Sequence, residues 1–142
     1  MANRELSKAE WLGKAEAYCA RAEHCAADVR RKLFEWGAPS DLFDEIGQNL
    51  YADGFLNDRR FCHAYVRDKL EYNQWGKLKI RAGLQSLQLP EPAIREALDE
   101  IDEEEYNRIL KHVINNSGRR DEQLLRFLLQ RGFSYEDIKK CK

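Results

Sequence analysis

The sequence lacks any long apolar run. No stretch approaches the ~20 apolar residues that a helix needs to span a bilayer, and the opening residues, MANRELSKAE, contain no apolar signal segment. We therefore expect a cytoplasmic protein that does not contact membranes. Of the 142 residues, 43% are hydrophobic and 35% are charged. These proportions are ordinary for a chain that buries a core, and the length allows one domain or a short array of small units.

Recognisable sites for metals, cofactors and catalysis are also missing. The sequence contains no glycine-rich phosphate loop, no nucleophile elbow and no H-E-x-x-H pair. The four cysteines are too scattered for a zinc-type C-x-x-C pair, so we expect free thiols, with redox sensing as the less favoured alternative. They are Cys19, Cys25, Cys62 and Cys141. We predict no enzyme activity, no cofactor and no metal site.

Apolar residues recur with helical spacing almost throughout the chain. The sequence Ser7-Lys8-Ala9-Glu10 is a capping box that begins a first helix. A second helix, roughly residues 26–36, is expected to end at Gly37, which tolerates a left-handed backbone. Ser40 is expected to cap a third helix that Asp53-Gly54 ends, and Asn57 to cap a fourth. We expect Phe55 and Leu56 to fill the corner between those two helices.

The helical pattern repeats along the chain. Apolar positions at Val29, Leu33 and Phe43 recur 51 residues later at Ile80, Leu84 and Ile94. A third, shorter copy follows 44 residues after the second, with Leu124, Leu128, Gly132 and Ile138. Because a three-helix unit of this size buries little apolar surface alone, neighbouring copies should stack. We predict an all-α fold of tandem three-helix repeats that forms an elongated array.

The repeat gives a predicted domain organisation. Residues 1–24 form an N-terminal helix, 25–71 the first repeat, 72–117 the second, and 118–142 a partial third repeat with one helix pair. Three apolar residues, Phe34, Leu78 and Leu129, lie off the main apolar stripe. We expect packing between repeats to cover them, with contact to a partner as the alternative.

Charge is segregated along the chain although the net charge is only −1. Between residues 59 and 81 there are only two acids but seven basic residues: Arg59, Arg60, Arg67, Lys69, Lys77, Lys79 and Arg81. Residues 91–105 contain eight acids and a single arginine. The basic segment predicts a surface that binds a polyanionic partner. The alternative is a solvated helical face whose cations are neutralised by the 91–105 segment.

Helix pairs joined by short turns, such as residues 26–36 with 41–52, also resemble a helix-turn-helix motif. The candidate second helices read LFDEIGQNL and AIREALDEI. They are acidic and offer almost no side chains for base edges. A helix-turn-helix-like DNA-binding regulator is therefore the alternative function.

Three stretches together resemble the RecX family: AEHCAADVRRKLFEWG (22–37), LYADGFLNDRRFCHAYVRDKL (50–70) and WGKLKIRAGLQ (75–85). The closing Gly132-Phe133 before Ile138 completes the resemblance, which covers nearly the whole chain from about residue 15. Two positions depart from the family pattern. Cys25 stands where a serine cap is common, and Gln88 stands where a glycine usually ends the first helix of the second unit.

The resemblance implies a curved array of tandem three-helix units. It also implies a regulator that binds the RecA recombinase, especially its filament on single-stranded DNA, and inhibits or modulates its ATPase, recombination and strand-exchange activity. Weak direct binding of nucleic acid is compatible with it, and no small-molecule substrate is implied. Taken with the charge pattern, the seven basic residues between 59 and 81 are the predicted filament-binding residues.

Overall fold

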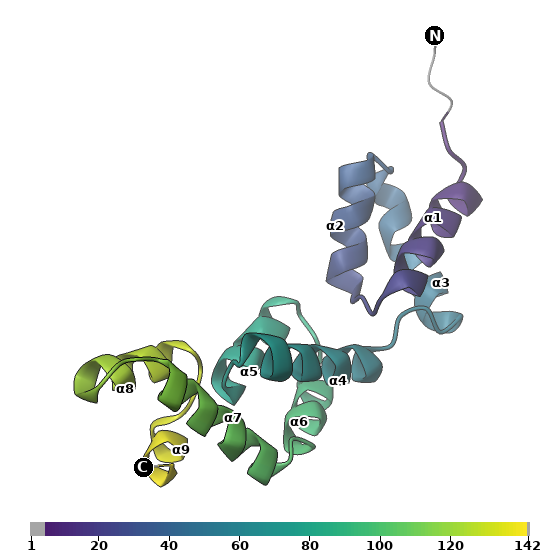
Figure 1. Cartoon of the computed structure of the whole chain (residues 1–142). Coiled ribbons are helices and arrows are strands. Elements are labelled where there is room, and N and C mark those ends of the chain that lie inside the picture. The colour runs from purple at the N-terminus through teal and green to yellow at the C-terminus, as the bar shows by residue number, and fades with distance from the viewer. Residues whose placement is uncertain (1–4, 142) are drawn as a thin grey trace. The chain divides into compact units, whose positions relative to one another are not determined.

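The computed structural model describes residues 5–141, and every regular element within that range is helical (Figure 1). Two short turns, η1 (a 3₁₀ turn, Ser40–Leu42) and η2 (a π turn, Lys69–Asn73), interrupt the α-helices. The α-helices are α1 (Lys8–Arg21), α2 (Ala26–Trp36), α3 (Phe43–Ala52), α4 (Asp58–Asp68), α5 (Lys77–Ser86), α6 (Glu91–Asp99), α7 (Glu103–Asn116), α8 (Asp121–Gln130) and α9 (Tyr135–Lys140). Within the described range, no helix has the length and apolar character required to cross a membrane. The predicted all-α fold is confirmed.

The chain divides into two compact units between Phe61 and Cys62, inside α4. The predicted repeat boundaries near residues 24, 71 and 117 stay a prediction, and so does the elongated, curved arrangement. Within each unit, the structure shows how the local sequence signals produce helices and a core.

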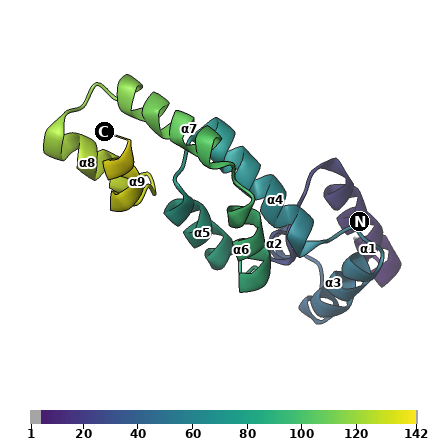
Figure 2. The same ribbon diagram turned by 90° about the horizontal axis from the view of Figure 1, so that it is seen from below.

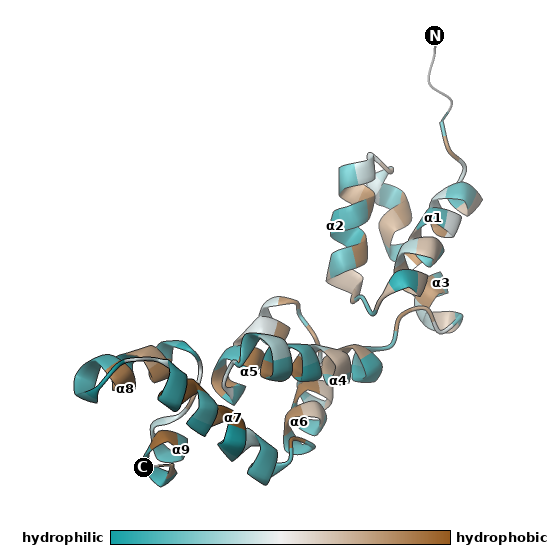
Figure 3. Cartoon of the chain, viewed as in Figure 1, coloured by the Kyte–Doolittle hydropathy of each residue, from teal (hydrophilic) through white to brown (hydrophobic). Residues whose placement is uncertain are grey.

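Helices α1, α2 and α3 enclose the core of the first unit. Figure 3 shows their hydrophobic residues on the sides that face one another. The core residues are Trp11, Ala15, Cys19, Val29, Leu33, Phe43, Ile46, Leu50 and Leu56. The capping box before α1 is confirmed, because Ser7 Oγ accepts from the N–H of Glu10 while Glu10 accepts from the N–H of Ser7. Burial of this stripe supplies most of the free energy that holds the three helices together.

Ser40 does not cap α3, contrary to the expectation from the sequence. Residues 40–42 form η1, in which the N–H of Leu42 donates to the carbonyl of Pro39 at 3.1 Å. The chain therefore enters α3 through a tighter turn, and α3 begins at Phe43 without a side-chain cap.

The corner between α3 and α4 is confirmed as an architectural element. Gly54 has a φ of +81°, which allows the N–H groups of Phe55 and Leu56 to reach back to the carbonyl of Leu50 at 2.8 and 3.1 Å. Leu56 is only 2% exposed, so it closes the core of the first unit. Asn57 Oδ1 then accepts from the N–H of Arg60 at 2.9 Å and caps α4.

The same left-handed turn follows α2, α5 and α8. Gly37, Gln88 and Gly132 have φ values of +82°, +63° and +100°. In each case the next residue donates its N–H to a buried leucine four residues before the turn residue, namely Leu33, Leu84 and Leu128. Gln88 therefore keeps the left-handed turn although a non-glycine residue is strained there.

The second unit is built around α7 and the pairs α5–α6 and α8–α9. Figure 2 shows α8 beyond the C-terminal end of α7, and α9 returns toward the N-terminal half of α7, where Cys141 Sγ lies 3.9 Å from Asn107 Oδ1. The largest fully buried side chains of the second unit are Tyr106, Phe133, Leu70, Ile80, Leu84, Ile94, Leu110, Leu128 and Ile138. The rings of Tyr106 and Phe133 pack with centroids 5.6 Å apart. The repeated stripe predicted at Ile80, Leu84 and Ile94 therefore lies in the core.

The prediction that repeat packing covers Phe34, Leu78 and Leu129 is wrong. Their exposed fractions are 76%, 56% and 44%. The main stripe already fills each core, and side chains on other sides of the same helices lie outside it. The predicted free thiols are confirmed: all four cysteines are unpaired with one another, three of them buried and Cys141 partly exposed.

Candidate partner-binding surface

The predicted basic segment extends from α4 through η2 into α5. Arg59 and Arg60 belong to the first unit, and the other five basic residues belong to the second. Arg60 supports the α3–α4 corner, because its guanidinium pairs with Glu23 and donates to the carbonyl of Gly54 at 3.0 Å. Arg59 is exposed on the first turn of α4.

Three of the five cations in the second unit form ion pairs with acidic side chains of the same unit. Arg67 donates to Glu105 at 2.8 Å and also pairs with Glu71, and these hydrogen bonds raise its pKa. Lys77 pairs with Glu103 at 2.9 Å. In the same way Arg81 pairs with Glu91. The glutamates at 91, 103 and 105 come from the acidic 91–105 segment, so the neutralising alternative holds for these three cations.

Lys69 and Lys79 meet aromatic rings instead of carboxylates. The ammonium groups of Lys69 and Lys79 lie 4.8 and 4.5 Å from the centre of the Trp75 ring, and Lys69 also lies 5.3 Å from the Tyr65 ring. Neither lysine has a carboxylate partner within residues 5–141. An aromatic face attracts a cation without cancelling its charge. We call Lys69, Trp75 and Lys79 the Trp75 cluster.

The turn after α8 fixes the backbone of the Trp75 cluster. The guanidinium of Arg131 donates to the carbonyls of Gln74 and Asn73 at 3.0 and 2.8 Å. The N–H of Gly76 donates to the carbonyl of Arg131 at 2.8 Å, and the N–H of Leu78 donates to the carbonyl of Gly132 at 3.0 Å. Four hydrogen bonds therefore hold the chain on both sides of Trp75.

Two glycines make this close approach possible. A Cβ added at Gly76 would overlap the backbone of Gly132 and the amide of Phe133. A Cβ added at Gly132 would overlap the side chain of Lys79 and lie 2.6 Å from its backbone nitrogen. The family resemblance rests partly on these two glycines, and the structure gives their physical role: they let two backbones touch.

Tyr106 anchors the first turn of α5 beneath the surface. Its hydroxyl accepts from the N–H of Lys77 at 2.9 Å, and the Lys77 ammonium lies 4.6 Å from the centre of its ring. Burial raises the pKa of Tyr106 well above its ordinary value of 10.0. The phenol therefore stays neutral at physiological pH and keeps its role as a hydrogen-bond partner.

One group of described residues has the donor types of a metal site. His63 of α4, Glu96 of α6 and Glu100, the residue after α6, each place one ligand atom within 4.8 Å of the others. His63 Nδ1 lies 3.2 Å from Glu100, and Nε2 lies 3.9 Å from Glu96. The two carboxylates are exposed at the surface, so we interpret the group as a surface polar cluster.

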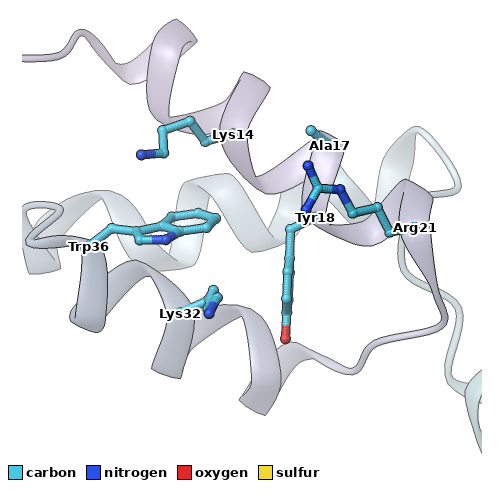
Figure 4. A pocket seen from close by; sticks show the side chains of 6 residues that line it. All are labelled: Lys14, Ala17, Tyr18, Arg21, Lys32 and Trp36. Carbon is cyan, nitrogen blue, oxygen red and sulfur yellow. The ribbon is translucent and has the colours of Figure 1, made fainter.

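A second basic and aromatic surface lies in the first unit and was not predicted from the sequence. Between α1 and α2 there is a groove with a volume of about 390 Å³ (Figure 4). We call it the α1–α2 groove, and its lining residues are Lys14, Ala17, Tyr18, Arg21, Lys32 and Trp36. The signal was present as Lys14, Tyr18 and Arg21 at helical spacing.

Comparison with known proteins identifies the family. The model of the second three-helix domain of RecX matches residues 57–98. The chain is 31% identical over 126 residues to a regulatory protein RecX from Pseudomonas entomophila (strain L48), covering 84% of this chain and 81% of that protein. It is 33% identical over 132 residues to one from Geobacillus kaustophilus (strain HTA426), covering 86% of this chain. It spans about half of the Geobacillus protein, 48% of its length.

A solved structure shares the fold. The crystal structure of RecX from Lactobacillus salivarius superimposes with a TM-score of 0.76 at 19% identity, covering 94% of this chain and 93% of that one. The fold likeness agrees with the sequence relationship, in which identity above 30% extends over most of the Pseudomonas protein. This chain therefore belongs to the RecX family of regulatory proteins.

Proposed function

We propose that this protein binds the RecA recombinase, in particular its filament on single-stranded DNA, and restrains its ATPase and strand-exchange activity. It acts in the cytoplasm as a regulator, needs no cofactor and catalyses no reaction of its own. Membership of the RecX family carries this proposal, because the curated relatives are named regulatory proteins.

We propose the Trp75 cluster as the principal contact of the second unit with the filament. Lys69 and Lys79 keep their charge available, whereas Arg67, Lys77 and Arg81 must first lose an internal carboxylate partner. Breaking such a pair offsets much of what a new contact contributes. Arg59 and Arg60 remain predicted contacts of the first unit, with Arg60 limited by its role at the corner.

The experiment measures RecA ATP hydrolysis and strand exchange on single-stranded DNA with increasing amounts of the protein. Both activities should fall, while the protein alone hydrolyses no ATP. Unchanged RecA activity at saturating protein would reject the proposal. Binding to duplex DNA of one sequence, with no effect on RecA, would support the helix-turn-helix alternative.

Paired variants test the contact. Lys69→Gln with Lys79→Gln should weaken association with the RecA–DNA filament by about tenfold at low salt and flatten its salt dependence. The matched control, Lys77→Gln with Arg81→Gln, removes the same charge from the same segment and should weaken binding by less than about threefold. Equal losses in both variants would show that ion pairing inside the protein does not select the contact residues.

A further inference from the structure

The α1–α2 groove combines cations with aromatic rings and has no acidic lining residue. Lys14, Arg21 and Lys32 supply three positive charges around it. Lys14 and Arg21 have no carboxylate partner within residues 5–141. The Lys32 ammonium pairs only with the exposed carboxylate of Glu35, at 3.5 Å. Its volume of about 390 Å³ lies within the range of about 300–1,000 Å³ that small-ligand sites occupy.

Aromatic rings hold two of these cations in place. The Lys14 ammonium lies 4.7 Å from the centre of the Trp36 ring and 5.5 Å from that of Trp11. The Lys32 ammonium lies 5.8 Å from the centre of the Tyr18 ring. The rings position both side chains but leave their net charge in place, so the groove keeps a positive potential.

The rings of Trp36 and Tyr18 form a corner of the groove. Trp36 and Tyr18 meet edge to face, with centroids 6.1 Å apart and planes at 83°. Tyr18 is fixed by stacking on His24 at 3.8 Å. Figure 4 shows Lys14 and Lys32 on opposite sides of the Trp36 ring, with Tyr18 standing beyond its edge and Arg21 beside Tyr18. A planar group that displaces one lysine from the ring would stack there and leave that lysine free for an anion.

We propose that the α1–α2 groove binds single-stranded nucleic acid directly, with a base against Trp36 and flanking phosphates on Lys14, Lys32 and Arg21. Alternation of bases and phosphates matches the alternation of rings and cations, which is how unpaired strands are bound without sequence preference. An acidic peptide would satisfy the cations but leave the rings without a planar partner. A duplex keeps its bases stacked inside. The proposal does not depend on RecA.

The experiment measures fluorescence anisotropy of a labelled oligo(dT) of about 20 nucleotides with the full chain and no RecA, from about 50 to 200 mM salt. Lys14→Gln with Lys32→Gln should weaken binding about tenfold and reduce the slope of log K against log salt by about 1.4, for two lost phosphate contacts. The control, Lys8→Gln with Arg30→Gln, removes two cations of α1 and α2 that pair with Glu45 and Asp44, and should bind within about twofold of the parent.

The ring is tested separately from the charge. Trp36→Phe should retain most of the affinity, while Trp36→Leu should lose about fivefold or more, since one stacked base contributes that much. Melting curves identify a variant that fails to fold. An oligomer of the same length without bases should bind about fivefold more weakly than oligo(dT), which tests stacking without any mutation.

Competitors decide the class of ligand. Unlabelled oligo(dT) should displace the probe far better than poly-glutamate, duplex DNA or dTMP. Equal competition by poly-glutamate would assign the groove to an acidic protein surface, and equal competition by dTMP to a free nucleotide; either result overturns the proposal. The same is true if the Lys14–Lys32 variant and its control bind alike. RecA inhibition, measured separately, reports only on the proposed regulatory function.

Discussion

Helices α2 and α5 bury equivalent apolar residues 51 positions apart, but their cations have different surroundings. On α5, Lys77 and Arg81 face glutamates and Lys79 faces the Trp75 ring. On α2, Arg30 faces Asp44, while Lys32 lies between Glu35 and the Tyr18 ring. Lys77 also lies beside the Tyr106 ring, but it pairs with Glu103, whereas Lys79 has the Trp75 ring and no carboxylate. The group opposite a cation, rather than the number of cations, therefore decides where positive charge stays available.

The two helices also begin differently. Cys25 precedes α2, and its N–H donates to Asp28 at 3.3 Å, so the helix start is satisfied from within. Gly76 precedes α5, and its N–H donates to the turn after α8. The start of α5 therefore depends on tertiary packing, whereas the start of α2 depends on a local acidic residue.

If the two helices are equivalent scaffolds, truncating their central leucines should have equal effects. Leu33 and Leu84 are both fully buried. Leu33→Ala and Leu84→Ala should each lower the free energy of unfolding by about 2–5 kcal/mol, measured by urea denaturation. Leu78→Ala, at an exposed position, serves as the control and should change it by less than about 0.5 kcal/mol. A loss below that value at either buried leucine would mean that the repeat was misassigned.

A glycine-to-alanine substitution should reveal that the start of α5 depends on tertiary packing, through its effect on the free energy of unfolding. Gly76→Ala forces a Cβ into the backbone of Gly132 and should cost about 3 kcal/mol through overpacking and loss of the hydrogen bonds there. Gly47→Ala, inside α3 with nothing within 4 Å of the added Cβ, should be neutral or stabilising by up to about 1 kcal/mol. Thermal melting measures both. Equal stability of the two variants would contradict the backbone contact.

Local features of the fold were predictable from the sequence. The capping box at Ser7, the cap at Asn57 and the left-handed Gly37 follow from chemistry within a few residues, and the structure confirms each. Exposure of Phe34 and Leu78 was missed, because helical spacing says which residues share a face but not whether a neighbour covers it.

The candidate surfaces were harder to predict. The sequence indicated a basic segment but not which of its cations are paired, since Glu103 and Glu105 lie 26 and 38 residues from Lys77 and Arg67. The α1–α2 groove escaped notice because an aromatic residue at helical spacing is usually a core residue. Trp36 lines a groove only because α1 packs beside α2, and this packing is not visible in the sequence.

Alkaline pH tests the contribution of Cys25, the buried residue that precedes α2, to stability. Burial raises the pKa of the Cys25 thiol from 9.0 to about 11. The unfolded chain releases this proton above pH 9 while the folded chain keeps it, so the stability that Cys25 contributes is complete below pH 9 and declines as the pH rises through 11. At pH 10 the loss should be about 1 kcal/mol. Cys25→Ser should lose less stability between pH 9 and 11 than the parent; parallel curves would contradict the assignment.

The smallest expected effects concern the ion pairs that distinguish the two helices. Arg81–Glu91 on α5 has side chains 32% and 43% exposed, whereas Arg30–Asp44 on α2 has side chains 57% and 85% exposed. Water screens the second pair more, so its coupling energy in a double-mutant cycle should be smaller. We expect about 0.5–1 kcal/mol for Arg81–Glu91 and less than about 0.5 kcal/mol for Arg30–Asp44, each measured by urea denaturation of the Gln variants. Both couplings should shrink in about 1 M salt, where the Debye length falls to about 3 Å.

A larger coupling for Arg30–Asp44 would mean that exposure does not rank these pairs. A coupling near zero for Arg81–Glu91 would return Arg81 to the set of available cations, and the distinction between the Trp75 cluster and the rest of α5 would no longer hold.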